Sequence, residues 1–80
     1  MVMDTNTLND ATKLRRGVGA RIAELRAARG WTQEQLAEKI EVSARYLQAI
    51  EGGRENLTLD SLAKVGNALG CSVAALFADG

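Results

Sequence analysis

The sequence predicts an all-α fold, a compact bundle of five short helices. The chain has 80 residues, contains no proline, and 46% of its residues are hydrophobic. Alanine and leucine are abundant, no segment keeps the polar-apolar alternation of a half-buried strand, and glycines separate the apolar segments. A chain of this length can build one core only. We therefore expect a domain over residues 14–80, preceded by an N-terminal tail over residues 1–13 that is partly disordered or extends the first helix.

The first helix is predicted from apolar residues that recur at helical spacing, namely Val18, Ile22 and Leu25. Gly30 follows where a glycine commonly ends a helix in the left-handed conformation. Leu8, Ala11 and Leu14 could extend this helix backwards. Two glycines, Gly17 and Gly19, weaken the case for one unbroken helix, because glycine is a poor helix former.

The second and third helices are predicted from residues that favour helix starts. Thr32 and Gln35 form a capping-box pattern, so we expect the second helix over about residues 33–40. Ser43 is a good N-cap for a third helix over residues 44–51. The two helices are short and almost adjacent in sequence, so they must cross at a steep angle.

The last two helices are bounded by glycines and hydroxyl residues. Gly52 and Gly53 end the third helix, Thr58 can cap the fourth, and Gly70 ends the fourth. Ser72 can cap the fifth. Each helix has one apolar face, formed by Leu62, Val65, Gly66 and Leu69 in the fourth and by Val73, Leu76 and Phe77 in the fifth.

Composition argues against an enzyme and against a metalloprotein. The chain has no histidine, which is the commonest general base and metal ligand, and its single cysteine, Cys71, cannot assemble a zinc site. We therefore expect no metal, no cofactor and no small-molecule ligand. No apolar segment is long enough to cross a membrane and the first ten residues lack a hydrophobic signal segment, so we expect a cytoplasmic protein.

The charges are balanced in total but unevenly distributed. Ten basic and ten acidic residues give a formal net charge of zero. Residues 1–29 hold six bases and three acids, whereas residues 30–80 hold four bases and seven acids. A local basic surface is therefore possible, although the neutral total argues weakly against a nucleic-acid partner.

The outer face of the third helix has no evident structural role. Leu36, Val42, Leu47 and Ile50 can anchor the helix pair, and Ala37 is small enough for a close crossing. The crossing leaves a helix on the surface that is narrow enough for a DNA major groove. Its free face holds Ala44, Arg45, Gln48 and Ala49, with Tyr46 at its side.

Three segments of this sequence resemble the Cro and phage-repressor (XRE-type) helix-turn-helix family. They are residues 21–26 (RIAELR), residues 32–53 (TQEQLAEKIEVSARYLQAIEGG) and residues 62–77 (LAKVGNALGCSVAALF). The similarity extends over roughly residues 14–78 and implies a lambda-repressor-like DNA-binding domain. Residues 55–62 are in addition similar to restriction-modification controller proteins. Glu41 departs from the family pattern, which usually has glycine at this left-handed position of the turn.

The resemblance also implies roles for individual residues. Gln33 would meet a phosphate and brace the start of the third helix, and Arg26 would pair with Glu51. Base edges would be read by Ala44, Arg45, Gln48, Ala49 and Tyr46. The DNA backbone would be contacted by Gln33, Ser43, Gly52, Gly53, Arg54 and Asn56. Arg45 is the strongest candidate, because a guanidinium can donate two hydrogen bonds to guanine. Tyr46 could equally pack at the helix edge.

Two functions follow. The first is a sequence-specific transcriptional regulator, a repressor or activator, that binds a pseudo-palindromic operator of double-stranded DNA as a homodimer; a restriction-modification controller is one candidate. The dimer interface would hold Val73, Leu76 and Phe77, with the alternative that Val73 and Leu76 only close the core. The second function is a protein-interaction module, such as an antitoxin or bridging partner, which the neutral charge and the two alanines on the outer face favour.

Overall fold

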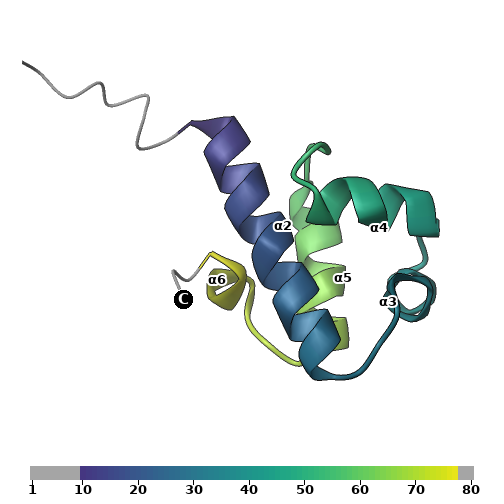
Figure 1. Ribbon diagram of the computed structural model, residues 1–80. Coiled ribbons are helices and arrows are strands. Elements are labelled where there is room, and N and C mark those ends of the chain that lie inside the picture. Colours follow the sequence, from purple (N-terminus) through teal and green to yellow (C-terminus); the bar gives the residue numbers. More distant parts are fainter. Residues whose placement is uncertain (1–9, 78–80) are drawn as a thin grey trace, which may run out of the picture.

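The computed structural model describes residues 10–77 and confirms the all-α prediction. In this range the chain forms five α-helices and no strand: α2 (Ala11–Ala28), α3 (Gln33–Lys39), α4 (Ala44–Glu51), α5 (Leu59–Leu69) and α6 (Val73–Leu76). The long helix α2 contacts α4, α5 and α6, and α4 also packs against α3 (Figure 1). The fold therefore places α3 and α4 on one side of α2 and the short α6 on another.

Each of these helices begins with a side chain that caps it. Thr32, Ser43, Thr58 and Ser72 accept hydrogen bonds from backbone amides in the first turns of α3, α4, α5 and α6, as predicted. The Thr32 and Gln35 capping box is complete, with a bond from each residue to the other. Asp10 caps α2 in the same way, so the first helix starts three residues before the expected domain.

The core lies between all five helices. Its buried residues come from every element: Val18, Ile22, Leu36, Ala37, Ile40, Leu47, Ile50, Leu62, Val65, Leu69 and Leu76. Trp31 and Cys71 are half-buried and pack against this cluster. The Arg29 guanidinium donates a hydrogen bond to the Leu69 carbonyl, which joins the end of α2 to the end of α5. Within residues 10–77 no helix is long and apolar enough to cross a membrane.

One glycine explains why α2 continues where the sequence suggested an interruption. A Cβ atom at Gly19 would lie 2.8 Å from the Glu51 carbonyl oxygen, whereas a Cβ at Gly17 would meet nothing within 4 Å. Gly19 is thus the point at which α4 crosses α2 at backbone distance. The helical propensity lost at this glycine is offset by the close packing of two helices.

Candidate nucleic-acid interface

The geometry of α3 and α4 depends on a four-residue connection, residues 40–43. Ala37 is buried where the two helices approach, and its carbonyl accepts a hydrogen bond of 2.9 Å from the Val42 amide. Glu41 has a φ of 61°, the left-handed conformation in which a side chain costs about 1–2 kcal/mol. The turn therefore forms with glutamate in the place that usually holds glycine.

The outer face of α4 is divided between exposed and half-buried side chains. Arg45 and Gln48 are exposed, and Leu47 and Ile50 point into the core. Ala44, Tyr46 and Ala49 are half-buried, and Ala44 and Tyr46 pack against the core cluster. Only Arg45 and Gln48 of the five predicted base-reading residues thus offer long polar side chains that are fully available to a partner.

An enclosed ion pair fixes the end of α4 against α2. The Arg26 Nε donates to Glu51 Oε2 at 2.7 Å and Nη2 donates to Oε1 at 3.1 Å. The third nitrogen of the guanidinium, Nη1, donates to the Trp31 carbonyl at 2.7 Å. The hydrogen bond with Glu51 raises the pKa of Arg26 above its ordinary value. One guanidinium therefore links α2, the α2–α3 connection and α4.

Gln33 braces the opposite end of the third helix from the one implied for it, and its contact with a phosphate stays a prediction. Its Nε2 donates to Glu51 Oε1 at 2.9 Å, so it braces the end of α4 rather than the start. The crossing of the two helices is the reason, because it brings the first turn of α3 beside the last turn of α4. Ser43 caps the start of α4 instead, with its hydroxyl accepting from the Tyr46 amide at 3.0 Å.

The two glycines after α4, which the resemblance places at the DNA backbone, have their amides occupied within the protein. The amides of Gly52, Gly53 and Arg54 donate to the carbonyls of Gln48, Ile50 and Ala49 at 2.8–3.0 Å. These bonds complete the end of α4. Gly53 is buried with a φ of 73°. What the loop offers to a partner is therefore its arginine, since Arg54 is exposed.

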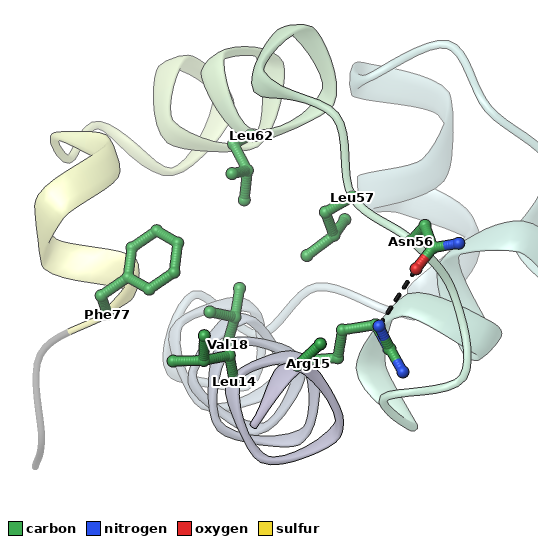
Figure 2. A pocket seen from close by; sticks show the side chains of 8 residues that line it. Leu14, Arg15, Val18, Asn56, Leu57, Leu62 and Phe77 are labelled. Carbon is green, nitrogen blue, oxygen red and sulfur yellow. Dashed lines mark hydrogen bonds between the residues drawn. The ribbon is translucent and has the colours of Figure 1, made fainter. Parts of the chain in front are cut away.

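Asn56 lies in the loop between α4 and α5 and faces α2. Its Oδ1 accepts a hydrogen bond of 3.1 Å from Arg15 Nη1, at the end of an apolar groove (Figure 2). Asn56 remains exposed, so the bond does not remove it from solvent. Arg15 itself was not among the residues that the sequence singled out, and nothing in the pattern of α2 distinguishes it from its basic neighbours.

The predicted dimer interface is only partly available in the folded chain. Leu76 is 1% exposed and belongs to the core, because α6 is a single turn that needs this side chain to hold it in place. The prediction that Leu76 lies in the dimer interface was therefore wrong, and its alternative, that Leu76 closes the core, describes the structure. Val73 is half-buried and Phe77 is 48% exposed. Phe77 lies with Leu14 and Leu57 around the groove in Figure 2.

These features define the class of protein: a small all-helical domain that presents a short, tightly positioned helix at its surface. The chain belongs to the helix-turn-helix family, whose model matches residues 22–76. The resemblance to XRE-type regulators that the sequence indicated is thereby confirmed, and the family is one of DNA-binding regulators.

Relatives of this chain include known regulators. It is 48% identical over 59 residues to the immunity repressor protein of Bacillus phage phi105, a match that covers 74% of this chain and 41% of the repressor. The chain thus spans less than half of that relative. Its fold is similar to the clp gene regulator ClgR of Corynebacterium glutamicum, with a TM-score of 0.76, 43% identity and coverage of 79% and 67% of the two chains. It is also similar to the restriction-modification controller protein C.AhdI of Aeromonas hydrophila, with a TM-score of 0.75, 34% identity and coverage of 78% and 94%.

Proposed function

We propose that this chain is a sequence-specific transcriptional regulator that binds a pseudo-palindromic operator as a homodimer and acts in the cytoplasm. The observation that carries the proposal is the exposed pair Arg45 and Gln48 on a helix whose end is held by the Arg26–Glu51 ion pair. A helix fixed in this way can place two polar side chains at base edges in the major groove. Arg45 would read guanine, and Gln48 would read a neighbouring base.

The homodimer is supported by the apolar groove beside α6. The groove has a volume of about 190 Å³ and is lined by Ala11, Leu14, Arg15, Val18, Asn56, Leu57, Leu62 and Phe77. Phe77 and Leu14 are large apolar residues that the protomer leaves exposed. A second copy would cover them, and a dimer that binds adjacent major grooves needs its two copies of α4 about 34 Å apart, one turn of DNA.

The similarity to C.AhdI favours the controller class among regulators, since 94% of that protein is matched. A controller, a phage repressor and an activator would all present α4 to the major groove.

A selection from random duplexes tests DNA binding. We expect the protein to enrich an inverted repeat with half-sites one helical turn apart. The Arg45→Ala variant should bind the enriched site with about 10-fold less discrimination at one base pair of each half-site, which is the loss expected for one bidentate contact. Lys64→Ala, at an exposed position of α5, is the control and should keep the discrimination. No enrichment at moderate salt by folded protein would contradict the proposal.

The oligomeric state is tested separately by sedimentation. We expect a dimer for the wild-type chain and a monomer for Phe77→Asp, because a charge in the covered groove would be costly to desolvate. A wild-type monomer at all concentrations, with DNA binding intact, would restrict the proposal to single half-sites.

The second candidate, a protein-interaction module, is favoured by the half-buried Ala44 and Ala49 on the outer face of α4. The two functions respond differently to salt. Binding to several phosphates weakens steeply as salt rises, whereas association through apolar surface does not.

A further inference from the structure

Two arginines stand beside the Gly52–Gly53 pair at the end of α4. A Cβ atom at Gly53 would lie 2.7 Å from Arg16 Cγ and 2.8 Å from Arg16 Cα, so this glycine packs directly against α2. A Cβ atom at Gly52 would meet the Arg54 guanidinium. Because consecutive Cα atoms are about 3.8 Å apart, the side chains of Arg16 and Arg54 leave the molecule from neighbouring points.

This surface continues from the outer face of α4. The Arg54 Nη2 donates a hydrogen bond of 3.5 Å to the Gln48 carbonyl, and Gln48 is one of the two exposed polar residues of that face. From Gln48 the surface continues over Arg54 and the exposed Gly52 towards Arg16. The Arg15–Asn56 hydrogen bond provides a second contact between the loop and α2. The N-terminal half of α2 is therefore held next to the residues proposed to meet DNA.

Among residues 10–77 no ion pair neutralises the positive charge of this surface. The ion pairs among residues 10–77 are Arg21–Glu24 and Arg26–Glu51, and neither involves Arg15, Arg16 or Arg54. Arg16 and Arg54 are exposed, and Arg15 is half-buried beneath its bond to Asn56. The loop carries one acidic residue, Glu55, which makes no ion pair with described residues. Three guanidinium groups that lie beside the same loop and make no ion pair with residues 10–77 fit the phosphates of a nucleic acid strand.

We propose that Arg16 contacts the DNA backbone, so that α2 extends the interface beyond the helix-turn-helix. Arg15 supports this contact by holding α2 to the loop through its hydrogen bond to Asn56. This inference rests on the proposed function. Gly53 serves it indirectly: the buried glycine brings α2 close enough to the loop for Arg16 and Arg54 to reach the same strand. The contact adds affinity that is independent of sequence, because phosphates carry no base identity.

The salt dependence of operator affinity tests the proposal. The logarithm of the binding constant is measured against the logarithm of salt concentration for wild type and Arg16→Gln, on the operator and on an unrelated duplex. Loss of one phosphate contact should reduce the slope by about 1. Between about 50 and 200 mM salt the binding constant of the wild type should therefore fall by about fourfold more than that of the variant. Both duplexes should be affected alike.

Two matched variants complete the experiment. Lys64→Gln removes a positive charge from an exposed position of α5 and should leave the slope at the wild-type value. Arg16→Lys keeps the positive charge and should retain most of the wild-type slope. Denaturant unfolding shows whether Arg16→Gln remains folded. An unchanged slope in folded Arg16→Gln overturns this inference and leaves the proposed function intact. If the wild-type protein binds no duplex, the proposed function itself is contradicted. An acidic polypeptide would then be the partner that fits the basic surface.

Discussion

Arg26 and Glu51 form a two-point ion pair that is almost closed to solvent. The side chains are 17% and 6% exposed, and the two hydrogen bonds measure 2.7 and 3.1 Å. Two further hydrogen bonds hold the pair, one from Arg26 Nη1 to the Trp31 carbonyl and one from Gln33 Nε2 to Glu51 Oε1. A pair of this kind contributes little net stability relative to an apolar pair, but removing one partner leaves a charge without compensation.

Glu51→Ala should therefore lower the free energy of unfolding by about 3 kcal/mol, since Arg26 would stay enclosed without its carboxylate. Urea denaturation followed by circular dichroism measures the change. Glu24→Ala is the control, because Glu24 pairs with Arg21 while its side chain is 67% exposed. That variant should change stability by less than about 0.5 kcal/mol. Equal effects of the two substitutions would contradict the enclosure of the Arg26 pair.

The two glycines of α2 should respond in opposite directions to alanine. Gly17→Ala places a methyl group in open space, and we expect it to stabilise the protein by about 1 kcal/mol through helix propensity. Gly19→Ala forces a methyl group against the carbonyls of Ile50 and Glu51. It should destabilise the protein by about 1–3 kcal/mol. Thermal unfolding of both variants under the same conditions measures the two changes in stability. A stabilising Gly19→Ala would show that α2 and α4 can separate at little cost.

Glu41 offers a substitution that should relieve backbone strain. The residue has a φ of 61°, and glycine adopts this conformation without steric cost. We expect Glu41→Gly to raise the free energy of unfolding by up to about 1 kcal/mol, the rest being offset by the greater freedom of glycine in the unfolded chain. Glu41→Ala keeps the strain and separates the loss of charge from the gain in backbone freedom. If the alanine variant is stabilised as much as the glycine variant, the charge rather than the backbone is responsible.

The start of α2 should depend on pH through Asp10. Its carboxylate accepts from the Thr12 amide at 2.7 Å and from the Lys13 amide at 3.4 Å, and these bonds lower the pKa of Asp10 below its ordinary value. A lowered pKa means that the cap is fully present above about pH 4 and is lost as the pH falls through the folded-state pKa. Amide hydrogen exchange at Thr12 and Lys13 should then accelerate relative to the middle of α2. Asp10→Asn keeps a capping oxygen without a titrating group, so its exchange pattern should not change over this range.

Local chemistry explains which parts of the structure were predictable. Thr32 and Ser43 cap their helices as expected, because a cap bonds to amides only two or three residues away. The helix ends at glycines, such as the end of α5 at Gly70, were predicted equally well, because glycine favours the left-handed conformation. The helix pair and its exposed Arg45 followed from spacing and from a resemblance extending over most of the chain.

Contacts between distant segments account for the differences. Gly17 and Gly19 look alike in sequence, and only the crossing of α4 makes the second one necessary. The partner of Gln33 is likewise decided by how helices meet. The amides of Gly52 and Gly53, in contrast, are occupied locally, by carbonyls of α4 itself. Whether Leu76 joins a dimer or closes the core was left open, because apolar spacing does not reveal how much of a one-turn helix is buried; the structure places it in the core.

The enclosure of Arg26 affects how such a protein dissociates from DNA. Dissolved ions screen Arg16, Arg45 and Arg54, which are exposed, but counterions have little access to the guanidinium between α2 and α4. A rise in ionic strength can therefore detach the molecule from a duplex while α4 keeps its orientation. On return to dilute buffer, rebinding needs no rearrangement of the helices.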